Sequence, residues 1–233
     1  MRSPMVIGRG TAAMVAGAVM MLSPLPLVAQ GAVSGQVAVL EKAGTVSADL
    51  ANSVIALELP VGVKPKLKVA HALVTMHGRE FIPHVSVLTI GSTVQFQNQD
   101  PFQHNAFSNS AAGTFDFGLS DRGTTVDQVL RRAGVFPVFC NIHARMSAYL
   151  VVVATPYYVQ AGTDGRFTIA AVPAGTYTLH VWNERGGDVS RALVVPAAGV
   201  TDANAQLDAR GFQTAAHKNK FGQDYTSAGG ERY

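Results

Sequence analysis

Apolar and polar residues alternate with a period of two along much of the chain, and this pattern predicts strands that each present one apolar face. The clearest case is the segment 85–100, where the alternation is interrupted by a turn signal at residues 91–92. After that turn, Val94 and Phe96 fall on one face of the expected strand, and their immediate neighbours are polar. This segment therefore predicts two strands on either side of the turn, the second of which has one apolar face.

Further strands are expected where short apolar or alternating runs lie between Gly, Pro and Asp turn signals. They cover residues 36–41, 53–59, 134–140, 148–154, 166–170, 176–183 and 189–195. Helical periodicity is scarce, and the segment 125–132 fits a short helix and a strand equally well. The residues from Gly211 onward are polar with scattered aromatics, which is typical of a loose tail. The sequence therefore predicts an all-β fold built from sandwiches.

The first 29 residues differ from the rest of the chain and predict a secretory signal peptide. Arg2 and Arg9 give a positive start, residues 11–22 form an uncharged apolar run, and the small residue Ala29 follows at the expected cleavage point. The apolar run is short for a bilayer span, and an uncleaved anchor is the alternative. The signal peptide predicts a periplasmic or secreted protein.

The charge balance argues against nucleic acid as a partner. The formal charge of the chain falls from +3 to +1 without residues 1–29, because that segment holds two arginines and no acidic residue. Nucleic-acid binding requires clustered Lys and Arg on one face. No later apolar run approaches the length of a membrane span, so none is expected after signal cleavage.

The chain contains one cysteine, Cys140, which excludes a disulfide within the chain. A lone thiol in an exported protein is buried and inert, paired between chains, or bound to a metal. Here the neighbours favour a metal, because an imidazole at His143 and a thioether at Met146 follow Cys140 at three-residue intervals. A thiolate and a thioether beside imidazole select copper, and a trigonal site of two His and one Cys with a weak axial Met is the electron-transfer geometry.

The second imidazole of such a site is expected from His104, which follows the strand pair of residues 85–100. The other histidines are expected too early in the chain, on the surface or in the tail: His71, His77, His84, His180 and His217. Two further features have two interpretations each. Phe102 and Phe107 either wall the metal pocket or pack in the core, and Arg145 is either a solvated charge or a group that attracts an acidic redox partner.

These residues resemble a cupredoxin of the plastocyanin and amicyanin kind. The likeness covers roughly residues 69–154. Before the ligands, the matching features are Phe81-Ile82-Pro83 and the spacing of Gly91, Val94, Phe96, Asn98 and Asp100. At the ligands, they are the pair His104-Asn105 and the spacing of Cys140, His143 and Met146. The short gap between His143 and Met146 is similar to that of amicyanin. One departure is Ala144, which stands where the family often has proline, and it leaves the identity of the partner open.

The resemblance implies a Greek-key β-sandwich with one copper ion near one end, cycling between Cu(I) and Cu(II). It implies that Asn105 hydrogen-bonds between the two ligand loops. It further implies that the partners are a protein electron donor and a protein electron acceptor, and that the protein is not an enzyme.

A second resemblance covers residues 163–177, which look like the prealbumin-like, regulatory β-sandwich of carboxypeptidases. The first strand of such a module is missing just before Thr163, and residues 31–60 are the candidate to supply it. The expected division of the chain is a signal peptide at 1–29, N-terminal strands at 30–67, a copper domain at 68–155, the small module at 156–210 and a polar tail at 211–233. The N-terminal strands either pair with the small module or belong to the copper domain.

Three functions remain open at this point. The first is a one-electron carrier that holds copper through His104, Cys140, His143 and Met146. The second is a protein that stores, delivers or senses copper. In the third, the accessory sandwich binds glycan or peptide on Tyr157, Tyr158 and Trp182, and the copper is structural.

Overall fold

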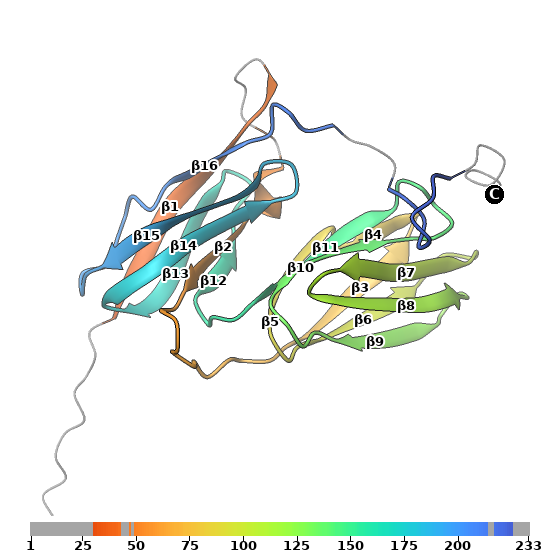
Figure 1. Cartoon of the computed structure of the whole chain (residues 1–233), viewed down its shortest axis with the longest axis horizontal. Helices are drawn as coiled ribbons and strands as arrows, with labels where there is room; N and C mark the ends of the chain where they lie inside the picture. Colours follow the sequence, from red (N-terminus) through yellow and green to blue (C-terminus); the bar gives the residue numbers. More distant parts are fainter. Residues whose placement is uncertain (1–29, 43–46, 48, 214–216, 226–233) are drawn as a thin grey trace, which may run out of the picture.

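The computed structural model describes residues 30–42, 47, 49–213 and 217–225, so the expected signal peptide lies outside the described residues. The described part is built from strands, joined by one short 3₁₀ helix at Leu50–Asn52, and it confirms the all-β fold class. None of its helices has the length and apolar character needed to cross a membrane. The strands form two sandwiches that lie side by side (Figure 1).

The central sandwich contains strands β3 to β11, in two sheets of order β5-β11-β10-β7-β8 and β4-β3-β6-β9. The crossovers in this order place strands from both ends of the segment beside one another, as in a Greek key. The strand bounds are β3 His71–His77, β4 Glu80–Ile82, β5 Val85–Thr89, β6 Thr93–Asn98, β7 His104–Ser110, β8 Gly113–Ser120, β9 Thr125–Val129, β10 Gly134–Phe139 and β11 Ser147–Val153.

The alternating positions of these strands make the core of the central sandwich. Val74 of β3 and Phe96 of β6 face Val138 of β10 and Leu150 of β11, and all four are at most 1% exposed. The turn between β5 and β6 is made by Gly91, whose φ of 90° favours glycine. The segment 125–132 forms the strand β9, which settles the choice between helix and strand that the sequence left open.

The flanking sandwich contains strands from both ends of the chain, in sheets of order β13-β1-β16 and β12-β2-β14-β15. Its strands are β1 Gln30–Leu40, β2 Val54–Glu58, β12 Tyr158–Gln160, β13 Arg166–Pro173, β14 Gly175–Asn183, β15 Gly187–Val195 and β16 Ala205–Asp208. β1 pairs with β13 and β16, and β2 pairs with β12 and β14. The chain therefore leaves this sandwich after β2 and returns to it at β12, with the central sandwich between.

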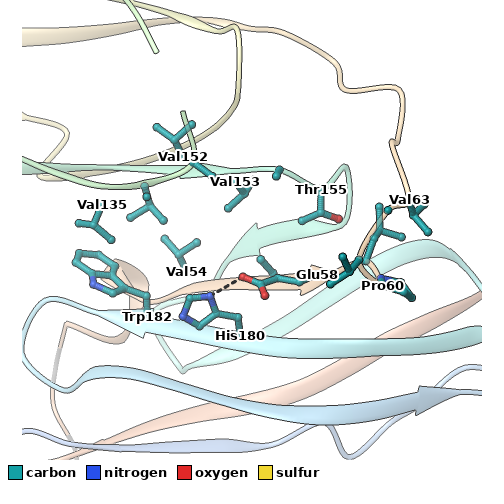
Figure 2. A pocket seen from close by; sticks show the side chains of 18 residues that line it. Val54, Glu58, Pro60, Val63, Val135, Val152, Val153, Thr155, His180 and Trp182 are labelled. Atoms are coloured by element: carbon teal, nitrogen blue, oxygen red, sulfur yellow. Dashed lines mark hydrogen bonds and ion pairs between the residues drawn. The ribbon is translucent and has the colours of Figure 1, made fainter. Parts of the chain in front are cut away.

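The two sandwiches meet through a small apolar cluster. Val54 and Ala56 of β2 pack against Val85 of β5 and against Val151 and Val153 of β11. Beside this cluster lies a cavity of about 540 Å³, lined by strands of both sandwiches and by the segment 59–63 (Figure 2). The interface is therefore apolar at its centre and hollowed at one side.

A histidine–carboxylate pair also joins the two sandwiches. His84 Nε2 lies 2.5 Å from Glu184 Oε2, and His84 Nδ1 lies 3.1 Å from the carbonyl oxygen of Ser147. The expectation of an exposed His84 is wrong, because Glu184 of the flanking sandwich half-buries it. The hydrogen bond to Glu184 raises the pKa of His84 above its ordinary value, against the opposing effect of burial.

This raised pKa predicts a pH-dependent contribution to stability. The charged pair is fully present below pH about 6.5, the pKa of an unfolded histidine, and is lost as the pH rises through the higher pKa of the folded protein. A Glu184→Gln variant should therefore lose about 0.5–1 kcal/mol of unfolding free energy at pH 6 and less at pH 9. Urea unfolding at both pH values measures this, with Glu80→Gln, at an exposed position of β4, as control. An equal loss at both pH values would contradict it.

Candidate metal centre

Three potential metal ligands meet at the end of the central sandwich that points away from the flanking one (Figure 1). His104 opens β7, and Cys140 and His143 lie in the loop between β10 and β11. One ligand atom of each side chain lies within 4.8 Å of the other two. Residues far apart in sequence thus form a cluster of two imidazoles and one thiol.

His104 is fully buried and held by a carboxylate. Its Nε2 donates to Asp100 Oδ2 at 2.7 Å, while its Nδ1 is buried and has no hydrogen-bond partner among the described residues. Asp100 also accepts from the backbone N–H groups of Gly78 and Arg79. Burial acts to raise the pKa of Asp100, but the hydrogen bonds from Gly78, His104 and Arg79 outweigh it and hold that pKa below its usual value. An ionised Asp100 fixes the proton on Nε2 and leaves Nδ1 as a free electron-pair donor.

Cys140 is fully buried, and its Sγ lies 3.5 Å from His143 Nδ1. The backbone N–H of Asn105 points to the same sulfur at 3.5 Å. Asn105 Oδ1 accepts from the Asn141 N–H at 3.2 Å, so this side chain joins the two ligand segments by hydrogen bonds. Burial raises the pKa of the thiol, so metal binding at neutral pH would release its proton.

His143 is partly buried, and its ring lies beside that of His104, with 4.9 Å between centroids. Burial, together with the nearby His104 and Arg79, lowers the pKa of His143 to about 4. At neutral pH the imidazole is therefore uncharged, which is the form that binds a metal.

Met146 closes the ligand loop through its backbone. Its carbonyl accepts from Cys140 N–H at 3.2 Å, and its own N–H donates to the His143 carbonyl at 3.1 Å. The side chain is 1% exposed and packs in the same core as Cys140. The loop is thus a compact turn whose first and last residues are both buried.

Phe102 and Phe107 differ in their position relative to the cluster. The Phe102 ring lies 5.2 Å from the His104 ring and 5.9 Å from the His143 ring, between centroids, so it walls the cluster. Phe107 instead packs on Phe139 and His217, with no ring contact to His104 or His143 among the described residues. Arg145 lies in the same loop and is exposed.

Two expectations about the remaining histidines are wrong. His77 was placed too early in the chain for the ligand end, yet its Nδ1 lies 3.3 Å from Asp100 Oδ1, next to the cluster. His217 was placed in a loose tail, yet its Nε2 lies 3.1 Å from the His143 carbonyl oxygen. Neither joins the three clustered ligands. His71 is exposed at the start of β3. His180 of β14 lies between the carboxylates of Glu58 and Asp188.

The C-terminal segment 217–225 packs on the ligand loop, a contact that the sequence did not predict. The Tyr225 hydroxyl donates to the Cys140 carbonyl at 2.7 Å, and the Lys220 N–H donates to Asn141 Oδ1 at 2.9 Å. The only signal in the sequence was a group of aromatic residues in an otherwise polar stretch.

The Asp100–His104 hydrogen bond leads to a prediction about metal affinity. Outer partners that orient a ligating imidazole are worth roughly 10–100-fold in metal affinity. An Asp100→Asn variant should therefore bind copper at least about 10-fold more weakly than the wild type in a competition titration. Asp121→Asn is the control. It changes an exposed carboxylate that accepts a hydrogen bond from Gln103 and does not contact His104. Equal weakening by both variants would contradict the role of Asp100.

Comparison with known proteins gives partial matches. Residues 147–206 match the family model described as polysaccharide lyase family 4, domain II. This match lies mostly in the flanking sandwich and begins in β11, and it does not confirm the likeness to carboxypeptidase modules. No curated protein matches the chain.

Several solved structures of copper proteins resemble part of the chain. A copper-containing nitrite reductase from Thermus scotoductus is 25% identical, with a TM-score of 0.35, over 42% of this chain and 25% of its own, so the chain spans about a quarter of that protein. A purple cupredoxin from Nitrosopumilus maritimus is 19% identical, with a TM-score of 0.32, over 35% of this chain and 99% of its own. An oxidised amicyanin variant is 18% identical, with a TM-score of 0.34, over 37% of this chain and 87% of its own. These likenesses are local and distant, so the case for the site rests on its own geometry.

Proposed function

We propose that this protein binds one copper ion through His104, Cys140, His143 and Met146 and carries one electron at a time between two protein partners. The observation that carries the proposal is the cluster of three side chains that each offer a donor atom within 4.8 Å of the other two, together with the buried and unpartnered Nδ1 of His104. A buried polar atom without a partner is costly unless a ligand satisfies it.

The donor set fits copper better than other common metals. Two imidazoles and a thiolate favour copper or zinc over magnesium, calcium and manganese, and a thioether at Met146 favours copper over zinc. Each ligand is supported by its surroundings: Asp100 holds His104, Asn105 points its N–H at the sulfur of Cys140, and Met146 is fixed by the loop backbone. The same supports would limit rearrangement when the charge of the metal changes.

The bound copper would supply a one-electron redox centre, and the chain supplies the surroundings. Burial of Cys140, Met146 and His104 excludes water, and the Phe102 ring covers both imidazoles. The partly exposed His143 gives the shortest covalent path from the centre to the surface. With four protein ligands the metal needs no open position, so we propose a carrier and not an enzyme.

The proposal includes export and the division of the chain. Residues 1–29 would act as a signal peptide that delivers the protein to the periplasm or the exterior, and we propose no nucleic-acid partner and no membrane span after cleavage. The domain limits remain those at 68–155 for the copper domain and 156–210 for the module. The strand pairing supports adding β1 and β2 to that module.

The test is the visible spectrum of the purified protein after addition of Cu(II), beside a Cys140→Ser variant. A thiolate-to-copper transition gives a strong band near about 600 nm, and we expect the variant to lose it. Ser108→Ala, a buried change on β7 that leaves the donor atoms in place, is the matched control and should keep the band.

Two other results would contradict electron transfer. A colourless protein that binds Cu(I) and passes it to an acceptor protein would favour storage, delivery or sensing of copper. A protein that binds copper in neither redox state would remove the metal function altogether.

A further inference from the structure

The C-terminal segment 217–225 makes hydrogen bonds to four residues of the ligand loop, at positions 140, 141, 143 and 144. Tyr225 and Lys220 bond to Cys140 and Asn141, as described above. The backbone N–H of His217 donates to the Ala144 carbonyl at 3.2 Å, and the His217 Nε2 lies 3.1 Å from the His143 carbonyl oxygen. The segment therefore binds the backbone of the loop that carries three of the four proposed ligands.

Side chains reinforce this attachment on the flank of the sandwich. The His217 ring stacks on Phe139, with 4.5 Å between centroids and 21° between planes, and the Tyr225 ring meets His217 edge-on. Lys220 Nζ lies 2.7 Å from Asp116 Oδ2, and the other oxygen of Asp116 accepts from Asn105 Nδ2. One salt bridge thus connects the segment to the asparagine that joins the two ligand loops.

We propose that residues 217–225 are a positioning element of the metal centre, which holds the ligand loop in its metal-binding conformation. This inference rests on the proposed copper function. Without the segment, the carbonyl oxygens of Cys140, His143 and Ala144 lose these partners, and the loop gains freedom to open. The segment therefore slows copper release and favours one ligand geometry.

The experiment compares the full chain with a chain that ends at Gln213 and with Tyr225→Phe. The copper-loaded proteins are mixed with an excess of chelator, and the decay of the visible band gives the release rate. We expect the shortened chain to release copper about 10-fold faster, as is typical when outer supports of a metal ligand are lost. We expect Tyr225→Phe to lie between the two. Asp224→Asn, which changes only the exposed pair with Lys218, should match the wild type.

A second measurement uses the metal-free protein, so it does not depend on copper binding. Amide hydrogen exchange at residues 140–146 should be faster in the shortened chain, while exchange in β3 and β6 stays unchanged. Adding a peptide of residues 214–233 should restore slow exchange. Unchanged exchange and unchanged release in the shortened chain would overturn the inference. Altered exchange in a protein that never binds copper would overturn the proposed function instead.

The cavity between the sandwiches carries a second, independent inference. Val152 and Val153 of β11 face Val54 of β2, and Trp182 of β14 lies at one end (Figure 2). The volume of about 540 Å³ lies within the range of small-molecule sites, and most such sites combine apolar walls with a few polar groups.

The polar groups of this cavity are rich in acceptors. His180 Nδ1 lies 3.1 Å from Glu58 Oε1, and His180 Nε2 lies 3.4 Å from Asp188 Oδ2. Both ring nitrogens of His180 are therefore engaged by carboxylates, and the second oxygen of Glu58 has no hydrogen bond within the described part of the chain. We also infer that the cavity binds a small apolar molecule that carries one hydrogen-bond donor, with the donor directed at Glu58.

Trp182 provides the measurement, because it is the only tryptophan in the chain. Cyclohexylmethanol and cyclohexyl methyl ether have the same formula, and only the alcohol has an O–H donor. We expect the alcohol to change the Trp182 emission in a saturable way and the ether to bind about 10-fold more weakly, the worth of one hydrogen bond. Glu58→Leu should remove this preference, and Asp188→Asn, outside the cavity lining, should keep it. No saturable change, or equal binding of alcohol and ether to the wild type, would overturn the inference.

Discussion

A His104→Ala variant should lose at least about 100-fold in copper affinity, because losing a ligand costs more than losing an outer partner, which is worth roughly 10–100-fold. The effect follows from the position of the side chain: His104 is fully buried, its Nδ1 has no hydrogen-bond partner among the described residues, and it offers a ligand atom within 4.8 Å of those of Cys140 and His143. No other imidazole in the described part of the chain lies within reach of both. The measurement is competition between the protein and a chelator of known affinity, followed by the visible band.

The matched control for this prediction is His71→Ala. His71 is exposed at the first position of β3, and it is another of the histidines considered from the sequence alone. Its removal should leave copper affinity unchanged. Wild-type affinity in His104→Ala would show that the second imidazole comes from elsewhere, and a loss in both variants would point to damage to the fold.

A Phe96→Ala variant should destabilise the protein by about 3–5 kcal/mol, the usual cost of removing a buried aromatic ring. Phe96 is 1% exposed, and its ring packs against those of Phe81, Phe115 and Phe117 with centroid distances of 5.5–6.2 Å. The vacated space lies between the two sheets of the central sandwich, where close packing on all sides limits collapse. Denaturant unfolding measures the loss.

Leu73→Ala is the control for this prediction. Leu73 lies on the neighbouring strand β3 but is 48% exposed, so its truncation should cost well under about 1 kcal/mol. A similar loss in both variants would mean that burial between the sheets does not decide stability here.

The strands could be predicted where the period of two is clean. The expected strands on either side of residues 91–92 correspond to β5 and β6, and the turn contains a glycine with positive φ. Buried residues alternate along β6, whereas β5 is buried on both faces. The expected pairing of residues 31–60 with the C-terminal module appears as the contacts of β1 and β2. The strand β9 was ambiguous because its residues are mostly half-buried or exposed, which weakens the apolar pattern.

For the candidate site, the sequence could predict only the ligand residues, from the chemistry and spacing of their donor atoms. The spacing of Cys140, His143 and Met146 indicates soft donors on one loop, and the structure brings the first two together with His104. The sequence could not indicate that segment 217–225 packs on that loop, because its hydrogen bonds reach mainly backbone carbonyls, which every residue carries. The placements of His77 and His84 were wrong because their carboxylate partners, Asp100 and Glu184, lie more than 20 residues away in the sequence.

The way the chain leaves and re-enters the flanking sandwich affects how that sandwich can assemble. The Leu57 N–H donates to the Tyr157 carbonyl at 2.8 Å, so the points of departure and return are one hydrogen bond apart. When the segments emerge in order from the N-terminus, β1 and β2 appear more than 100 residues before the strands that pair with them. Closing so long a loop from the unfolded chain is slow and entropically costly. Folding of the central sandwich first would bring its two ends together and shorten the effective loop, so the central sandwich would assist folding of the flanking one.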